Sequence, residues 1–290
     1  MAYRLLKSES ISASLRRIVA EELQAGFRQL TRKRPDTATA VHEVRKSIKK
    51  VRAALRLVRD QLGPYYSTEN ARLREISRRL AEARDAEAML QTLSDLEERT
   101  DRSFPSARDR LGAERAKQQS GQRGVLKEAA NGLRKTLEDE PPAIPENDFS
   151  TLAPGLRKTF RQGRKALRVV REDSSDANYH DLRKRVKDHW YHVRLLGNLG
   201  SKRVREYEKR LKRLGNWLGD DNNLAVLRQK IHSQPGAYGK PVEIAALQAA
   251  IQKRQRQLRR KALAYAEEIY GKKPGEMAGW LERRWRAWKK

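Results

Sequence analysis

Residues 41–62 read VHEVRKSIKKVRAALRLVRDQL, and two patterns run through them. Apolar residues recur at alternating spacings of three and four, which places their side chains on one face of an α-helix. They are Val41, Val44, Ile48, Val51, Leu55, Val58 and Leu62. The stretch therefore predicts an amphipathic helix whose apolar seam packs against neighbouring helices.

A row of basic residues follows the same spacing, one position after the apolar seam. It contains His42, Arg45, Lys49, Arg52, Arg56 and Arg59. Since one residue turns an α-helix by about 100°, the row should run along one margin of the buried face for ~25 Å. Like charges at helical spacing repel one another, so the row is destabilising unless an anion compensates it.

The same arrangement occurs twice more in the chain. One seam, made by Tyr179, Leu182, Val186, His189, Val193 and Leu196, has the row His180, Arg183, Lys187, Trp190 and Arg194. Another, made by Leu156, Phe160, Gly163, Leu167 and Val170, has the row Arg157, Arg161, Arg164, Arg168 and Arg171. One such row could be a solvated helix face. Three rows on the same side of their seams favour a groove for a polyanion, because Arg and Lys suit phosphate.

The composition points to the same kind of partner. The 290 residues include 65 Lys or Arg against 37 Asp or Glu, a formal net charge of +28. Such an excess destabilises a compact state unless salt or a polyanion screens it. The candidate partners are nucleic acid, an anionic membrane surface and another polyphosphorylated polymer; the alternative is a merely soluble basic protein.

Several classes of protein are disfavoured. The absence of cysteine excludes disulfides, thiol catalysis and zinc sites built on sulfur. The first residues, MAYRLLKSES, lack an apolar signal-peptide core, and no stretch approaches the ~20 apolar residues of a membrane span. We therefore expect a cytoplasmic protein without an integral membrane segment.

The helical patterns predict an all-α fold, since no segment shows the alternation of a strand. Gly63-Pro64 should end one helix, glycines at 121, 124 and 132 indicate a break in another, and EPPAIPEND at 140–148 is typical of a linker. The expected helices cover 9–33, 37–62, 68–83, 85–100, 106–138, 150–172, 176–199, 202–219, 222–232 and 241–270, followed by a short tail helix.

The chain also repeats itself. His42-Glu-Val-Arg-Lys-Ser-Ile-Lys aligns with His180-Asp-Leu-Arg-Lys-Arg-Val-Lys at an offset of 138 residues. Without a gap, the same offset aligns Leu80-Ala-Glu with Leu218-Gly-Asp and Asp85 with Asn223. Because a single offset aligns the residues from His42 to Asp85 without a gap, an internal duplication into two similar helical halves is favoured.

The doubled pattern His-x-x-Arg-Lys-x-x-Lys in a basic helical duplication resembles the CHAD family, the conserved histidine α-helical domain. The segment DLRKRVKDHWYHVRLL at 181–196 is similar to the family's second motif, and LAEARDAEAML at 80–90 resembles its next one. The resemblance covers roughly residues 3–270. The doubled motif in register is specific, whereas either copy alone would be weak.

The resemblance implies two antiparallel four-helix bundles with pseudo-twofold symmetry, a central basic channel and binding of inorganic polyphosphate without catalysis or cofactor. Some family members carry a CYTH triphosphatase domain, but its E-x-E-x-K signature is missing here, as in a stand-alone CHAD protein. We expect one domain over 1–290, with a first half (5–138), a linker (139–148), a second half (149–275) and a basic Trp-rich tail (276–290).

Carried over by position, the resemblance also implies a set of polyphosphate-binding residues. In the first half they are His42, Arg45, Lys46, Lys49, Arg52 and Arg56. In the second half they are His180, Arg183, Lys184, Lys187 and Arg194, with Arg157, Arg161, Arg164 and Lys165 from the preceding helix. Trp190 departs from the pattern because it stands where the first half has Arg52. The two halves are therefore not expected to bind the ligand equally.

Two groups of histidines have alternative interpretations. His42 and His180 begin their rows and could donate to phosphate oxygens, or could simply bond a neighbouring backbone group at a helix start. His189 and His192 are spaced like metal ligands, but His189 falls on the apolar seam and few acidic partners surround the pair. A packed core histidine is the preferred interpretation, and no metal site is expected.

Acidic residues give no catalytic pattern. Asp85 and its repeat mate Asn223 are both interpreted as helix N-caps, because Asn could not replace Asp as an acid or base. Asp220-Asp221 could bind a cation, but two acids without further ligands are a weak signal.

The tail contains Trp280, Trp285 and Trp288 among arginines. We expect these tryptophans to dock the last helix onto the body; the alternative is an element that binds a membrane or granule surface.

The sequence therefore predicts a non-enzymatic polyphosphate-binding protein. We expect it in the cytoplasm, where it could associate with polyphosphate granules. Three other functions stay open: a helical nucleic-acid-binding protein, an enzyme that metabolises polyphosphate and a structural protein of the granule surface. Few aromatic residues lie among the cations to stack bases, which disfavours a single-strand binder.

Overall fold

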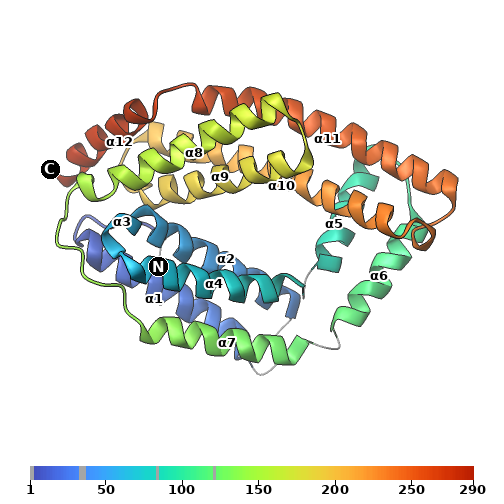
Figure 1. Ribbon diagram of the computed structural model, residues 1–290, viewed down its shortest axis with the longest axis horizontal. Helices are drawn as coiled ribbons and strands as arrows, with labels where there is room; N and C mark the ends of the chain where they lie inside the picture. Colours follow the sequence, from blue (N-terminus) through green and yellow to red (C-terminus); the bar gives the residue numbers. More distant parts are fainter. Residues whose placement is uncertain (1–2, 33–36, 83–84, 120–121) are drawn as a thin grey trace.

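The computed structural model describes residues 3–32, 37–82, 85–119 and 122–290, and these residues form an all-helical fold without strands (Figure 1). The all-α prediction is confirmed. The helices are α1 (Ile11–Leu30), α2 (Thr37–Leu57), α3 (Arg59–Leu62), α4 (Pro64–Glu82), α5 (Asp85–Thr100), α6 (Pro105–Gln119), α7 (Gln122–Glu138), α8 (Ala153–Glu172), α9 (Asp176–Leu195), α10 (Lys202–Ser233), α11 (Pro241–Tyr270) and α12 (Pro274–Lys289).

Local signals set most helix ends. Ser10 caps α1 by accepting a hydrogen bond from the backbone N–H of Ala13, and Ser175 caps α9 in the same way through Asn178. The predicted stop at Gly63-Pro64 is confirmed: α3 ends at Leu62, and Gly63 has a φ of +51°, which favours glycine. Residues 140–148 are non-helical, as expected of a linker.

Two helix predictions were wrong. The helix expected over 37–62 ends at Leu57, and α3 follows after Val58, whose ψ of 19° is not helical. The two helices expected over 202–219 and 222–232 are one continuous helix, α10, so Asn223 lies inside a helix and is not an N-cap. Asp221, at the predicted break, is buried and hydrogen-bonded to Gln255 and Arg259 of α11, which stabilises the uninterrupted helix. The side chain of Asp85 lies outside the described part, so its capping role stays a prediction.

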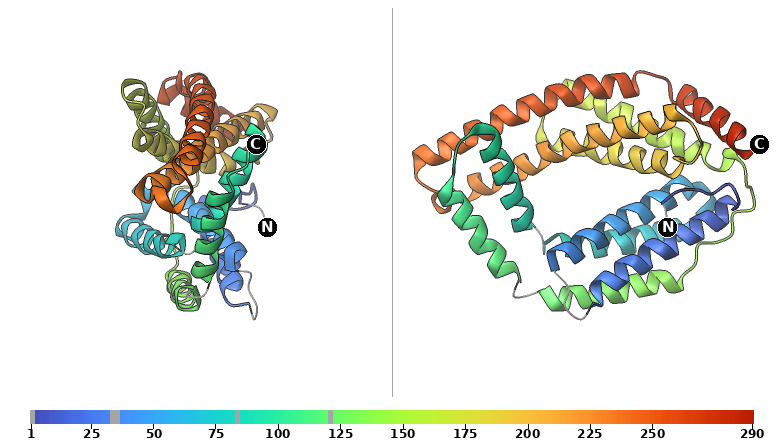
Figure 2. Two further views of the ribbon diagram at one scale, coloured as in Figure 1. Left: turned by 90° about the vertical axis from the view of Figure 1, so that its right-hand side faces the viewer. Right: turned by 180° about the vertical axis from the view of Figure 1, so that it is seen from behind.

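The helices pack in two groups that are joined at both ends (Figures 1 and 2). Helices α1, α2, α4 and α7 pack on one another, as do α8, α9, α10 and α11. Helix α2 contacts α8 and α9 directly, and α3 contacts α8. The α5–α6 hairpin leaves the first group and packs against α10 and α11, and α12 packs on α8.

Two hydrophobic cores correspond to this arrangement. The larger core contains the three predicted apolar seams, and every one of their residues is buried. The smaller core joins α5 and α6 to α10 and α11 through side chains such as Leu93, Phe104 and Leu227. Predicted docking of the tail is confirmed, because Trp285 is buried against Phe149 and the ring of Trp280 lies 5.4 Å from that of Tyr207.

Gly155 in the first turn of α8 allows a close approach of the two groups. A Cβ atom built on Gly155 would lie 1.9 Å from the carbonyl oxygen of Leu57, the last residue of α2. A backbone atom cannot move aside as the end of a flexible side chain can. Any larger residue at position 155 must therefore separate α8 from α2.

We predict that Gly155→Ala lowers the free energy of unfolding by about 1–3 kcal/mol or more, since overpacking forces backbone shifts. Chemical denaturation of the full chain measures the loss. The matched control is Gly112→Ala in α6, where an added Cβ meets no atom within 4 Å. That change should be neutral or raise the free energy of unfolding by up to ~1 kcal/mol through helix propensity. Equal effects of the two changes would contradict the proposed close contact.

Candidate functional site

The basic rows of α2 and α9 meet at Arg45 and Arg183. Burial lowers the pKa of the Arg183 guanidinium, and the positive charge of Arg45 lowers it further. Both side chains are half-buried, on helices that pack directly against each other. Because arginine stays protonated, a positive charge is kept in a partly buried place beside a second one, and the carboxylate of Asp220 offsets part of the effect.

Lys187 extends this cluster one turn along α9. A Cβ atom on Gly215 of α10 would lie 3.1 Å from Lys187 Cε, and one on Gly219 would lie 3.7 Å from Arg183 Nε. The two glycines thus allow the cations to lie against α10. Burial, followed by the charges of Arg183 and Lys212, lowers the pKa of Lys187 to about 8. Lys187 Nζ also donates a 3.5 Å hydrogen bond to the Asn216 side chain.

The other end of the two rows is compensated within the protein. Arg56 of α2 forms an ion pair with Asp188 of α9, and Asp188 and Tyr66 raise the pKa of Arg56 against the effect of burial. Burial raises the pKa of Asp188 although Arg56 lowers it. Arg52 Nε donates to Asn70 of α4 at 3.0 Å, and burial and then Arg56 lower the pKa of Arg52. This end binds α2, α4 and α9 together.

Trp190, which stands where the first half has Arg52, lies between two of the predicted cations. Lys187 Nζ is 5.0 Å and Arg194 Cζ 5.4 Å from its ring centroid, within the range of cation–π attraction. Arg194 also lies 5.7 Å from the ring centroid of Tyr3. The aromatic residue therefore positions neighbouring cations instead of supplying one.

The two row-starting histidines have different surroundings. His180 Nδ1 donates a hydrogen bond to the side-chain oxygen of Asn222 on α10, and burial lowers the pKa of His180. Its partner is thus a side chain of another helix, not the neighbouring backbone group considered from the sequence. The side chain of His42 is 48% exposed, and its Nε2 lies 3.9 Å from the carboxylate of Glu43.

His189 and His192 are core residues, as the seam position of His189 predicted. Both are 0% exposed, and burial lowers their pKa values to about 3. His189 packs edge-on against Phe160 and lies near Tyr207 and Tyr270. His192 Nε2 donates to the carbonyl oxygen of Ala53 in α2 at 2.9 Å. In the described part of the chain, no group of three or more His, Cys, Asp or Glu residues could hold a metal ion.

The remaining predicted residues lie on exposed surfaces. Lys46, Lys49 and Lys184 are exposed on α2 and α9. The α8 residues are also exposed: Arg157, Arg161, Arg164 and Lys165. Further along α8, Arg171 pairs with Glu267 of α11, and Arg168 lies 3.8 Å from Glu172. The uncompensated part of the α8 row is therefore its N-terminal half, and its role in binding stays a prediction.

Sequence reasoning missed two cations that belong to these clusters. Lys212 of α10 acts on Lys187, and Arg74 of α4 acts on Arg52. They are separated by 138 residues, the same offset that relates the two histidine motifs. Extending the alignment of the halves into the following helix would have identified both.

Comparisons with known proteins agree with this helical architecture. Residues 15–232 match the model of the CHAD domain family. The structure described as PptA from Streptomyces chartreusis superposes with a TM-score of 0.60 at 17% identity, covering 88% of this chain and 99% of that one. The CHAD domain from the plant Ricinus communis superposes with a TM-score of 0.60 at 20% identity, covering 93% and 95%.

No curated protein sequence matches the chain. Among the helices of the described part, none has both the length and the apolar character needed to cross a membrane. Since the family match spans most of the sequence and carries both histidine motifs, the chain belongs to the CHAD domain family.

Proposed function

We propose that the protein binds inorganic polyphosphate, without catalysis, in a basic channel between two helical halves. The observation that carries this proposal is the cluster of Arg45, Arg183, Lys187 and Lys212, gathered from three helices despite mutual repulsion. Burial makes this repulsion more costly, because fewer water molecules screen the charges. A chain of phosphates would supply the compensating charge, with bidentate contacts to the arginines.

We further propose that the two halves arose by duplication, as two four-helix bundles with pseudo-twofold symmetry. Helices α1, α2, α4 and α7 would form one bundle and α8, α9, α10 and α11 the other. The offset of 138 residues supports this, since it relates Arg45 to Arg183 and Arg74 to Lys212. The channel would then run where α2 meets α9, with cations contributed by both halves.

The binding residues proposed from the sequence remain those of α2, α8 and α9, to which we add Arg74 and Lys212. Two of these residues already pair with a carboxylate: the exposed Lys46 Nζ lies 2.9 Å from Glu43, and the half-buried Arg56 pairs with Asp188 across the α2–α9 contact. We propose a separate part for Arg56. Its proposed part is to hold α2 and α9 at the spacing that the phosphate chain needs. We expect the protein in the cytoplasm, where it would associate with polyphosphate granules.

Inorganic polyphosphate is favoured over single-stranded nucleic acid by the position of Trp190. Single-strand binders stack bases on aromatic faces among their cations. Trp190 lies within the cluster, but Lys187 and Arg194 already contact its ring. A ligand that is only a phosphate chain needs no such stacking.

We predict that Arg45→Ala/Arg183→Ala weakens binding of a polyphosphate of defined length, by about 1–3 kcal/mol for each desolvated phosphate contact. Isothermal titration calorimetry of the full chain measures the affinity.

The matched control is Arg256→Ala/Arg260→Ala, which removes two exposed arginines from α11. It should weaken binding only slightly, through net charge. Equal losses in the two double variants would show non-specific attraction and would overturn the proposed site. A third pair, Arg157→Ala/Arg161→Ala, tests whether α8 contributes to the same site.

Binding should also take up protons at about pH 8.5, where the Lys187 pKa of about 8 leaves much of this lysine neutral. Nearby phosphates favour its protonated form, so its pKa must rise in the complex and affinity must fall as pH rises through 8. Calorimetry in two buffers with different ionisation enthalpies measures the uptake. Lys187→Arg keeps the charge at every pH and should remove the uptake; identical proton uptake in this variant would rule out Lys187 as the source.

Competition distinguishes polyphosphate from nucleic acid. We expect duplex DNA or RNA, at equal phosphate concentration and physiological salt, to leave long-chain polyphosphate bound. Affinity for either ligand should fall with salt through counterion release, so the comparison must be made at one ionic strength. Displacement by nucleic acid would make the protein a nucleic-acid binder.

An enzymatic function makes a separate prediction. A polyphosphate-metabolising enzyme would release phosphate or shorten the chain when Mg²⁺ is added, since phosphoryl transfer normally uses metal-bound carboxylates. We expect no turnover under these conditions. Sustained turnover that Arg45→Ala/Arg183→Ala abolishes would contradict a purely binding role.

A further inference from the structure

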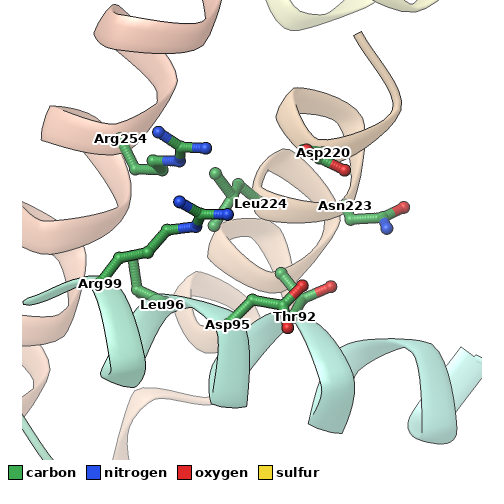
Figure 3. A pocket seen from close by; sticks show the side chains of 8 residues that line it. All are labelled: Thr92, Asp95, Leu96, Arg99, Asp220, Asn223, Leu224 and Arg254. Carbon is green, nitrogen blue, oxygen red and sulfur yellow. The ribbon is translucent and has the colours of Figure 1, made fainter. Parts of the chain in front are cut away.

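A second site lies where α5 meets α10 and α11 (Figure 3). A hollow there has a volume of about 40 Å³, room for roughly three water molecules. Its lining combines charged, polar and apolar side chains: Thr92, Asp95, Leu96, Arg99, Asp220, Asn223, Leu224 and Arg254. Leu96 and Leu224 are buried, whereas Asp95, Arg99 and Asp220 are exposed and leave the hollow open to solvent.

The charges around the hollow are of both signs and lie in two pairs. Figure 3 shows the guanidinium groups of Arg99 and Arg254 next to each other, with Asp95 on the α5 side and Asp220 on the α10 side. Burial lowers the pKa of Arg254, and Arg99 lowers it further. Burial raises the pKa of Asp220, and Asp95 raises it further, whereas the cations Arg254, Arg99 and Lys187 lower it. Each like-charged pair therefore interacts across the hollow.

None of these four charged side chains forms an ion pair within 4.0 Å with another described residue. Asp95 accepts a 2.8 Å hydrogen bond from Gln91, and Arg254 donates a 3.4 Å bond to Gln257. The neighbouring positions on the same two helices behave differently, since Arg259 Nε of α11 lies 2.8 Å from Asp221 of α10. Helices α10 and α11 thus form an ion pair between Asp221 and Arg259, whereas Asp220 and Arg254 of the same helices line the hollow.

We propose that this pocket binds the zwitterionic head group of a free α-amino acid. The carboxylate would bind the planar forks of Arg99 and Arg254, and the ammonium group would donate to Asp95 and Asp220. The side chain of the amino acid would extend to solvent through the open mouth. None of the four residues belongs to the set proposed for polyphosphate, although the charge of Asp220 also acts on Arg183 and Lys187 of that set.

Mixed charge argues against simpler ligands. An isolated anion would be attracted by the two arginines but repelled by the two carboxylates, and an isolated cation would experience the reverse. A zwitterion satisfies both pairs at once.

Binding of alanine and two analogues to the full chain tests the proposal. Lactate replaces the ammonium group of alanine by a hydroxyl, and ethylamine lacks the carboxylate. Nuclear magnetic resonance titration should show saturable binding of alanine, with both analogues weaker by about tenfold or more, the effect of losing one charge-assisted hydrogen-bonding group. Alanine that fails to saturate, or an analogue that binds as tightly, overturns the proposal.

Two double variants should have opposite effects on the analogues. Asp95→Asn/Asp220→Asn should weaken the binding of alanine and strengthen the binding of lactate, because the two aspartates no longer repel the carboxylate of lactate. Arg99→Gln/Arg254→Gln should weaken the binding of alanine and strengthen the binding of ethylamine, because the two arginines no longer repel the ammonium group. Damage to the fold would weaken every ligand, so a gain for one analogue separates recognition from unfolding.

The matched control is Glu98→Gln/Arg256→Gln. These exposed residues lie on α5 and α11 close to the lining residues in sequence, and they do not line the hollow. The control should leave all three affinities unchanged. A control that changes alanine binding as much as the lining variants do would show that net charge, not the pocket, governs the interaction.

Discussion

The burial of cations from two helices, Arg45 of α2 and Arg183 of α9, is the constraint on which the proposed binding site depends. Two guanidinium groups that approach from different helices would drive α2 and α9 apart unless other contacts held them. The apolar seams supply most of that attraction, because every seam residue of both helices is buried. His192, which donates across the contact to the Ala53 carbonyl, and the ion pair between Arg56 and Asp188 fix the spacing.

This division explains why the rows are not uniform. At one end, the charges are balanced within the protein and hold helices together. At the other end, burial lowers the pKa values of Lys187 and Arg183; Arg183 and Lys212 lower that of Lys187 further, Arg45 lowers that of Arg183 further, and the carboxylate of Asp220 offsets part of both effects. Gly215 and Gly219 add no side chain that would separate these cations from α10.

Much of the fold follows from the sequence, because it depends on local patterns. The seam of 41–62 is buried as its spacing of three and four predicts, and Gly63-Pro64 ends a helix because glycine and proline act on the backbone directly. The continuity of α10 could not be predicted in this way. At the expected break, Asp221 is hydrogen-bonded to Gln255 and Arg259 of α11, a long-range contact that no local pattern reveals.

The candidate site shows the same limit. The rows and the repeat predicted that cations of two helices belong together, but the repeat gave no sign of the Arg56–Asp188 pair, since the repeat mate of Asp188 is Lys50. The pocket beside α5 was equally hidden, because its charges come from three helices and form no sequence motif. Asp220 and Asp221 are adjacent in sequence, yet one faces the hollow and the other pairs with Arg259. Only the tertiary packing separates their roles.

The central claim is that the cations where α2 meets α9 bind a chain of phosphates. The most direct test is a crystal structure of the protein with a short inorganic polyphosphate at physiological salt. The account predicts phosphate density between α2 and α9, within hydrogen-bonding distance of Arg45, Arg183 and Lys187. Phosphates bound only along the exposed face of α8 or the tail, with the α2–α9 cations unoccupied, would contradict it.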